Sequence, residues 1–364
     1  MNTPPTVAIA TPVDGVFNVS SIFTFTATDL DSADQNGLFT YSIQWGDGTS
    51  STVVGPRNIT VPKTYTRVSS SGAFTISAQA TDARGAMGPV ATTPFVVLGW
   101  TLMTDPVATN KAILVVVGSQ GSDNIKVETK DANYYRVSIR DRDYDVLRQG
   151  TIYGDVDRIL VFAQSGNDKV TIDDDVYASA EIWGGAGDDD LKGGRGNDII
   201  MGEAGNDNLW GGDGRDIVIG GIGADRIHGD ANDDILVAGF TAFEAEFNRS
   251  APADFSSTSR LTFEQQRVAL EAILSEWASN RDYATRRQNI FGTGTGANGN
   301  NYFRTNNTVI TNNTVFDDNA VDTLWGDDGT DWFFANTVGD RGNVLDSIKD
   351  RTGNELVEDI DKWW

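Results

Sequence analysis

Aspartate residues recur at every ninth position in the middle of this 364-residue chain. Each lies in a nine-residue unit that begins with glycine and ends in a strand-forming tripeptide with an aliphatic centre. Glycines permit the backbone angles of tight turns and let carbonyl oxygens crowd together. Carboxylate and carbonyl oxygens are the ligands that hard divalent cations prefer. The candidate metal ligands are Asp189, Asp198, Asp207, Asp216, Asp225 and Asp234.

Six such units follow one another without a break from Gly184 to Val237: GGAGDDDLK, GGRGNDIIM, GEAGNDNLW, GGDGRDIVI, GGIGADRIH and GDANDDILV. They resemble the nonapeptide G-G-x-G-x-D-x-U-x of the RTX, or haemolysin-type calcium-binding, family of parallel β-rolls. The resemblance implies that two units make one turn of the spiral and that several Ca²⁺ ions lie between stacked loops. The glycines expected to take part are Gly185, Gly187, Gly194, Gly196, Gly205, Gly212, Gly214, Gly221 and Gly223.

By the same resemblance, alternate aspartates line opposite edges of the roll. One edge would hold Asp189, Asp207 and Asp225, and the other Asp198, Asp216 and Asp234. The alternative is an acidic solenoid that binds nothing. Unpaired carboxylates stacked along an edge would repel one another, which favours the calcium interpretation.

Weaker units extend the pattern in both directions. Asp123 and Asp168 occupy the aspartate position before the six units, and Asp322 and Asp331 occupy it in two later units. Ala180 replaces the aspartate in the coil before Gly184, so we expect that coil to lack a ligand. We infer that the period is interrupted by an insertion and that the roll then resumes.

The predicted fold is mainly β: an Ig-like β-sandwich followed by a parallel β-roll with a small helical insertion. Alternating apolar and polar residues between turn signals predict the sandwich. The string W-G-D-G-T from Trp45, with Tyr65 downstream, resembles the PKD family of Ig-like modules, which serve as spacers or adhesive accessories in exported bacterial proteins. The predicted segments are 1–98 sandwich, 99–162 N-terminal cap and degenerate roll, 163–238 calcium-binding roll, 239–316 helical insertion, and 317–364 resumed roll and C-terminal cap.

The insertion contains two expected helices. Thr262 and Gln265 form a capping box, and an apolar stripe at helical spacing follows at Leu270, Ile273, Leu274 and Trp277. We expect this stripe to dock on the roll, and a second short helix to span residues 282–289. The glycine-rich stretch 292–299 contains G-x-G-x-x-G without a βαβ unit, so it is predicted to be a loop. The acidic loop from Asp29 to Asp34 is either another calcium site or a solvated turn.

Composition narrows the classes of function. The chain has 52 acidic and 28 basic residues, a net charge of -24, and a pI near 4.2, which argue against nucleic acid and anionic membranes. A single histidine and no cysteine argue against histidine-dependent triads, zinc sites and thiol nucleophiles. The sequence shows no transmembrane run, and residues 1–5 do not form a signal peptide. We therefore expect a piece of a longer exported protein.

The predicted function is a calcium-binding structural or accessory module of a secreted or cell-surface bacterial protein, which folds when it meets Ca²⁺ outside the cell. We expect no catalysis within this chain, although an upstream catalytic domain would make it the tail of a hydrolase. The residues from 317 onward resemble the C-terminal regions of planctomycete-type surface proteins, which implies no activity.

A carbohydrate-binding or adhesion module is the alternative, with an extracellular polysaccharide or cell-surface glycan as partner. Trp183, Trp210 and Trp325 occupy the ninth position of their units, which faces outward in the roll family. Exposed aromatic rings can stack on sugars, unless other parts of the chain bury them. Trp183 and Trp210 lie three units apart, so we expect them on opposite faces.

Overall fold

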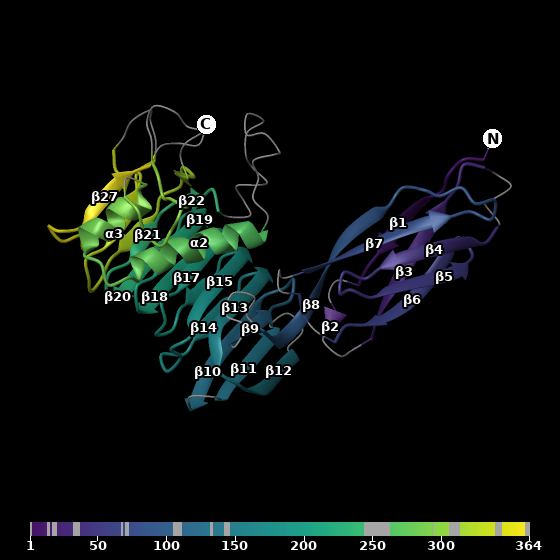
Figure 1. Ribbon diagram of the computed structural model, residues 1–364, viewed down its shortest axis with the longest axis horizontal. Coiled ribbons are helices and arrows are strands. Elements are labelled where there is room, and N and C mark those ends of the chain that lie inside the picture. Colours follow the sequence, from purple (N-terminus) through teal and green to yellow (C-terminus); the bar gives the residue numbers. More distant parts are fainter. Residues whose placement is uncertain are drawn as a thin grey trace. The chain divides into compact units, whose positions relative to one another are not determined.

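Strands dominate the computed structural model, which confirms the predicted mainly β fold (Figure 1). The structure describes residues 2–12, 15–16, 20–31, 37–66, 68–69, 73–104, 111–131, 134–141, 146–243, 263–292, 294–305, 314–338 and 344–360. The chain forms two compact units, residues 1–101 with 115–120, and residues 102–114 with 121–364. Neither helix among the described residues has the length and apolarity that crossing a bilayer requires.

The first unit contains an antiparallel β-sandwich. One sheet has the order β1-β3-β6, and the strands β8, β7, β4 and β5 pair in that order in the other. Phe23 packs against Trp45 with ring centroids 5.1 Å apart, and Tyr65 Oη donates a 3.0 Å hydrogen bond to the Trp45 carbonyl. The strands are β1 (Thr6–Ala10), β2 (Gly15–Val16), β3 (Ser20–Thr28), β4 (Phe39–Gln44), β5 (Ser50–Gly55), β6 (Asn58–Thr64), β7 (Ala73–Thr81) and β8 (Ala91–Thr104).

The acidic loop of the sandwich is described only as far as Asp31. Asp29 accepts hydrogen bonds from the Thr3 hydroxyl at 3.1 Å and from the backbone N–H of Asp31 at 2.7 Å. Arg84 forms an ion pair with Asp31. Asp34, the other end of the predicted calcium loop, lies outside the described residues.

The second unit is a parallel β-roll of two sheets. The first, which we call the open sheet, has the order β12-β11-β10-β14-β16-β18-β20-β24-β26. Antiparallel strands β11 and β12 end it on one side, where β10 also pairs in parallel with β14. Its strands are β10 (Asp123–Asp131), β11 (Tyr134–Asp141), β12 (Val146–Tyr153), β14 (Lys169–Ile172), β16 (Asp190–Lys192), β18 (Asn208–Asp213), β20 (Arg226–Ala231), β24 (Thr323–Trp325) and β26 (Ser347–Ile348).

The other sheet of the roll, which we call the covered sheet, has the order β27-β25-β21-β19-β17-β15-β13. Strand β9 (Ala112–Val117) is almost wholly buried, as its apolar sequence predicts. The covered sheet consists of β13 (Val156–Ser165), β15 (Ser179–Ala186), β17 (Ile199–Ala204), β19 (Ile217–Ile222), β21 (Ile235–Val237), β25 (Trp332–Ala335) and β27 (Leu356–Asp359).

The aliphatic eighth positions of the repeat form the core between the two sheets. Ile227 pairs in register with Leu324, and Leu236 pairs with Phe333, although each pair is separated by the insertion. The roll therefore resumes in phase, as the sequence predicts. These side chains are fully buried: Leu191, Ile200, Leu209, Val218, Ile227, Leu236, Leu324 and Phe333.

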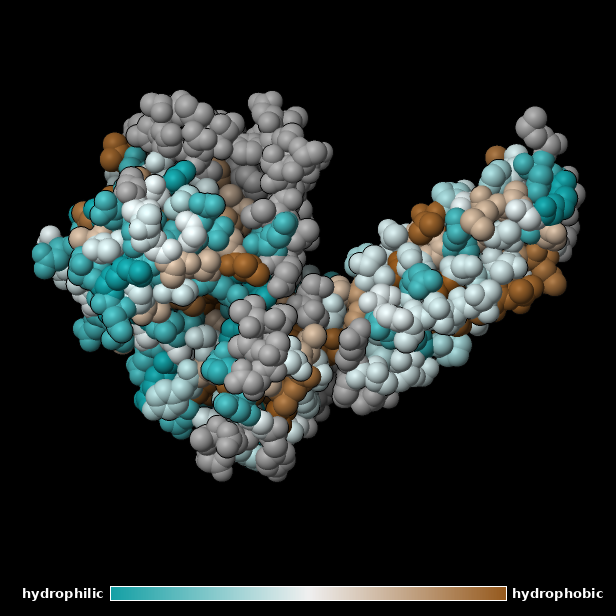
Figure 2. Space-filling view, viewed as in Figure 1, coloured by the Kyte–Doolittle hydropathy of each residue, from teal (hydrophilic) through white to brown (hydrophobic). Residues whose placement is uncertain are grey.

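The outer surfaces of the two sheets differ in character. In the covered sheet the seventh positions are fully buried isoleucines, Ile199, Ile217 and Ile235. In the open sheet the same positions are polar and at least partly exposed, as at Asn208 and Arg226. Figure 2 shows mostly hydrophilic residues over the roll in that view, with a few hydrophobic residues scattered among them.

The helical insertion covers the outer face of the covered sheet. Helix α2 (Phe263–Trp277) crosses the covered sheet near β17, and α3 (Tyr283–Ile290) follows it (Figure 1). Strands β22 (Phe240–Thr241) and β23 (Val315–Phe316) pair at its base. The rings of Trp277 and Trp332 lie 6.1 Å apart, so α2 packs directly on β25.

The predicted helical features agree with the structure where it describes them. Leu270, Ile273 and Trp277 are buried and Leu274 is half-buried, which confirms the apolar stripe. Asp282 caps α3 by accepting a 3.0 Å hydrogen bond from the Thr285 N–H. Thr262 of the predicted capping box lies outside the described residues. The described part of 292–299 contains turns and no strand, as predicted for a loop.

Candidate calcium sites

Seven aspartates form a continuous chain of hydrogen bonds along one edge of the roll, where the covered sheet leads into the open sheet. Asp123 begins the series, and the Oδ1 atom of each of the other six accepts the backbone N–H of the aspartate in the preceding turn, at 2.6–3.0 Å. This series of hydrogen bonds continues across the insertion, because the N–H of Asp225 donates to Asp322 at 2.7 Å. This first ladder consists of Asp123, Asp168, Asp189, Asp207, Asp225, Asp322 and Asp346.

A second ladder runs along the opposite edge, where the open sheet leads into the covered sheet. The same bonds join its four aspartates at 2.8 Å: Asp198, Asp216, Asp234 and Asp331. It begins at Ala180, whose N–H donates to Asp198 at 2.7 Å and which has no carboxylate to continue the series. The structure thus separates the aspartates into the two sets that the resemblance implied.

The second carboxylate oxygen distinguishes these aspartates from ordinary turn residues. In six of them Oδ2 is buried and has no hydrogen-bond partner within the described part of the chain: Asp189, Asp207, Asp216, Asp234, Asp322 and Asp331. Burying an ionised oxygen without a partner is costly, so such an atom indicates a missing ligand. Asp198 differs, since its Oδ2 accepts the Gly194 N–H at 2.8 Å.

The first glycine of each unit keeps open the space that these oxygens face. A Cβ atom on Gly202 would lie 2.2 Å from Asp207 Oδ2 and 2.4 Å from the Gly220 carbonyl oxygen. The corresponding distances at Gly211, to Asp216 Oδ2 and the Gly229 carbonyl, are both 2.5 Å. A carboxylate oxygen and a carbonyl oxygen of the next turn therefore approach the same small space, which any side chain would fill.

The predicted glycines lie in the same turns. Gly205, with φ of 151°, would place a Cβ only 1.9 Å from the Gly187 carbonyl, so this position accepts no side chain. Positive φ angles occur at Gly185, Gly187, Gly205, Gly212, Gly214, Gly221 and Gly223. Gly194 and Gly196 lie in the same turns, but their φ angles fall outside the range of +20° to +160° that favours glycine.

Two kinds of site residue were absent from the sequence prediction. The first-position glycines had a clear signal, because all six units keep glycine there, whereas Glu203 and Asn232 occur at the second and fourth positions. Asp346 continues the first ladder by accepting the Asp322 N–H at 3.0 Å. Its signal was weaker, since only Gly342, the aspartate and Ile348 of the nonapeptide remain.

This donor set fits Ca²⁺. Every candidate ligand is an oxygen, and calcium tolerates variable geometry with mixed carboxylate and carbonyl ligands. Among the described residues, no three acidic or histidine side chains converge on one point. A cation between loops would thus be held by ladder Oδ2 atoms together with carbonyls, including those of the first-position glycines.

Burial strongly disfavours the charged form of the ladder carboxylates when no cation is bound. It raises the pKa of Asp189 to about 8 and that of Asp207 to about 7. In the second ladder burial raises the pKa of Asp216 well above its ordinary value, and the neighbouring carboxylate of Asp198 adds to the effect. The bare roll therefore holds protons where a bound cation would otherwise compensate the charge.

These shifts predict how pH affects the metal-free roll. A carboxylate whose pKa is raised on folding takes up a proton when the roll folds. Its contribution to the stability of the folded roll is fully present below the unfolded pKa near 3.8 and is lost as pH rises through about 7 to 8. In EDTA, we expect the melting temperature of the roll to fall by at least about 5 °C between pH 5.5 and 6.5, and the metal-free roll to be unfolded at room temperature at neutral pH and above. Saturating Ca²⁺ should flatten or reverse this trend, because it competes with protons for the same oxygens. Circular dichroism melts check both; a melting temperature that rises with pH in EDTA contradicts the assignment.

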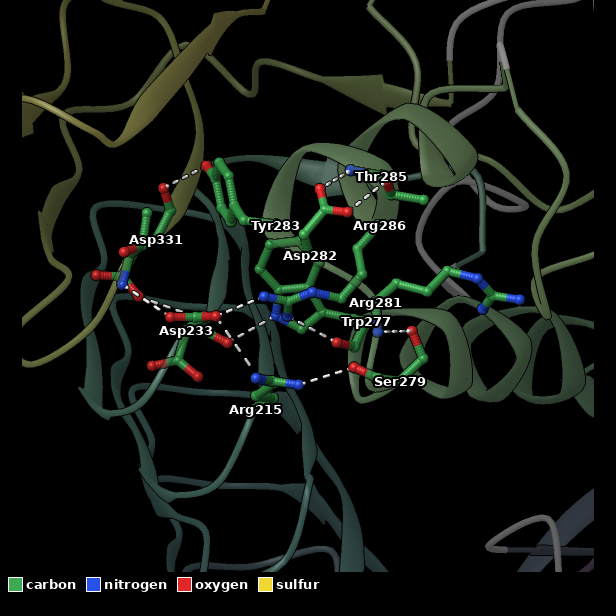
Figure 3. Close-up of polar contacts among 12 residues, drawn as sticks. Arg215, Asp233, Trp277, Ser279, Arg281, Asp282, Tyr283, Thr285, Arg286 and Asp331 are labelled. Atoms are coloured by element: carbon green, nitrogen blue, oxygen red, sulfur yellow. Dashed lines mark hydrogen bonds and ion pairs between the residues drawn. The ribbon is translucent and has the colours of Figure 1, made fainter.

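The helical insertion is anchored on the loops of the second ladder (Figure 3). Arg286 Nη2 lies 2.5 Å from Asp233 Oδ2, and Trp277 Nε1 donates to the Asp233 carbonyl at 2.7 Å. Tyr283 Oη donates to the Asp331 carbonyl at 2.9 Å. The insertion thus binds the roll through polar contacts as well as through the predicted apolar stripe. Asp233, at the fifth position of its unit, is a structural anchor that the repeat pattern did not indicate.

A family model of calcium-binding repeats agrees with this geometry. The family model of the RTX calcium-binding nonapeptide repeat matches in four copies, over residues 183–218, 210–240 and 309–341. The chain contains RTX calcium-binding repeats. The PKD domain of an M14-like peptidase from Thermoplasmatales archaeon SCGC AB-540-F20 is 22% identical, with a TM-score of 0.23, over 27% of this chain and 98% of that chain. No curated protein matches the sequence. The RTX repeats support calcium binding by this roll; the resemblance of the tail to planctomycete-type proteins stays a prediction.

The three tryptophans considered for ligand binding do not share one surface. Trp183 lies on the covered sheet, is 7% exposed and stacks on Phe162 with ring centroids 5.0 Å apart. It is therefore not available to a surface ligand, because its neighbour and the covered face enclose it. Trp210 and Trp325 lie on the open sheet and remain half-buried.

Proposed function

We propose that this chain is an extracellular structural module that folds when Ca²⁺ is supplied. The observation that carries the proposal is the pair of aspartate ladders, in which six buried Oδ2 atoms, those of Asp189, Asp207, Asp216, Asp234, Asp322 and Asp331, lack protein partners among the described residues. Bound Ca²⁺ supplies the positive charge that these ladders lack. The ladder carboxylates join successive turns, so neutralising them stabilises the stacking of the whole roll.

Folding after export is expected because calcium is abundant outside a cell and scarce inside it. Sites made of one carboxylate and several carbonyls have modest affinity, so they fill outside a cell and stay largely empty inside it. A cation that binds only the folded state adds its binding free energy to the stability of that state. RTX repeats are typical of exported bacterial proteins, which supports a secreted or cell-surface location.

We propose an accessory rather than a catalytic role for this chain. Its single histidine, His228, is held between aromatic rings and lies 3.1 Å from Asp327 Oδ2. Most of the buried aspartates of the roll belong to the ladders, where Oδ1 already accepts a backbone hydrogen bond, as at Asp207 and Asp216. The module would accompany the chemistry of another domain in a longer protein.

A calcium titration of matched variants tests the proposal. Asp207→Asn keeps the shape of a ladder residue and removes its charge, so we expect the Ca²⁺ concentration for half-maximal folding to rise about tenfold. Asp213→Asn is the control, because Asp213 ends strand β18, which begins directly after Asp207, but is exposed and pairs with Arg195 at 2.9 Å. Far-UV circular dichroism reports folding. A wild-type spectrum that does not change when Ca²⁺ is added overturns the proposal.

A further inference from the structure

The open sheet carries a column of aromatic rings on its outer surface. Trp210, His228 and Trp325 are register partners on β18, β20 and β24. The rings of Trp210 and His228 are nearly parallel with centroids 6.0 Å apart, and those of His228 and Trp325 lie 4.3 Å apart. All three side chains are half-buried, so part of each ring reaches solvent.

This column differs from the other apolar residues on the outside of the roll. On the covered sheet such residues lie beneath the insertion, as Ile199 and Ile217 do. On the open sheet the column stands among charged and polar side chains such as Arg226 and Asn208. Cross-strand stacking accounts for the close contact of His228 with Trp325. The Trp210 ring is more widely spaced from His228, and its register partner on the other side is Lys192.

A groove of about 350 Å³ opens beside Trp210. Its rim is held in place by neighbouring charges, since Lys192 Nζ lies 2.8 Å from Asp174 Oδ1 and Lys169 Nζ lies 3.7 Å from Asp190 Oδ2. Asn208 also donates to Asp190 at 2.9 Å. The polar side chains that line the groove are Lys169, Thr171, Asp190, Lys192 and Asp230.

We propose that this groove and the aromatic column bind a neutral polysaccharide, with one sugar ring against Trp210. A sugar ring offers an apolar C–H face to an indole and hydroxyl groups that both donate and accept hydrogen bonds. Lys192 and Lys169 are donors, Asp190 and Asp230 are acceptors, and this mixture matches hydroxyls better than it matches one sign of charge. The two carboxylates and the net charge of -24 disfavour an acidic polysaccharide.

Affinity electrophoresis of the full chain at millimolar calcium tests the site. The probes are dextran, laminarin, xylan and mannan, with alginate and polygalacturonate as acidic counterparts. We expect at least one neutral polysaccharide to retard the wild type, and Trp210→Ala to weaken that binding at least about tenfold. Tyr177→Ala is the matched control, because Tyr177 is a roll aromatic that is 71% exposed and lies outside the column.

Folding is measured on every variant by circular dichroism in the same buffer, so loss of binding is separated from loss of structure. Asp190→Ala is a second variant that leaves the column intact and should also weaken binding. The inference is overturned if no neutral polysaccharide retards the wild type, or if Trp210→Ala binds as well as the wild type. Retardation by acidic polysaccharides alone, or a concentration-dependent dimer that Trp210→Ala abolishes, also overturns it. Each result is independent of whether calcium is needed for folding, which the circular dichroism reports by itself.

Discussion

Removal of calcium should unfold the roll and leave the β-sandwich folded. In EGTA at neutral pH, we expect residues 163–238 to lose amide protection, because six ladder aspartates then keep a buried Oδ2 atom that has no partner among the described residues. One site filled to ten times its dissociation constant adds about 1.4 kcal/mol, so several sites together match the whole stability of an ordinary domain. Hydrogen exchange measured by mass spectrometry resolves the two units. The sandwich should keep its protection, since its core of Phe23, Trp45 and Tyr65 needs no metal.

Magnesium provides the control for this prediction. Mg²⁺ has the same charge as Ca²⁺ but requires near-octahedral geometry and keeps its water, so it should not restore protection at the same concentration. The strands around Leu209 and Val218 are the segments to follow, because they lie between the two ladders and are fully buried. If their amides exchange equally slowly in calcium and in EGTA, the ladders do not depend on a cation and the proposed function is wrong.

The ladders and the core of the roll could be predicted because the repeat encodes them locally. An aspartate at the sixth position and an aliphatic residue at the eighth recur whether or not neighbouring units are interrupted. The sequence pattern therefore predicted that Leu324 continues the series of Ile227 across the insertion, and the register confirms it. The sandwich was predictable for a similar reason, since alternating strands such as 74–78 need only local spacing.

The sequence also encodes the difference in polarity between the outer faces of the two sheets, but that pattern repeats every two units rather than every unit. Seventh-position residues are apolar in every second unit, as at Ile199 and Ile217, and polar in the others, as at Asp190 and Asn208. This alternation repeats every two units, which make one turn, so it assigns each set to one sheet. It predicts that one sheet is covered and the other faces solvent.

The anchoring of the insertion had no local signal. Asp233 and Arg286 meet at 2.5 Å although they are 53 residues apart, and no repeat position specifies that contact. The burial of Trp183 likewise depends on Phe162, a neighbour one turn away. Such contacts follow from tertiary packing, which a position in the repeat does not determine.

A charge at the seventh position should have opposite consequences on the two sheets. Ile217→Asp places a carboxylate on the covered sheet, where the side chain is fully buried, and should destabilise the roll by more than about 4 kcal/mol. Arg226→Asp places the same carboxylate at the same repeat position on the open sheet, where the side chain is exposed, and should cost less than about 1 kcal/mol. Urea unfolding in saturating calcium measures both.

The helix side of the interface gives an independent check. Ile273 is fully buried on α2, so Ile273→Asp should destabilise the roll nearly as much as Ile217→Asp, since the covered sheet and α2 share one apolar interface. Exposed Val268 on the same helix is the control, and Val268→Asp should change stability little. If Ile217→Asp destabilises but Ile273→Asp does not, the covered sheet is buried by something other than this helix. If both are tolerated, the insertion does not stabilise the roll, and the roll is held by its ladders and inner core alone.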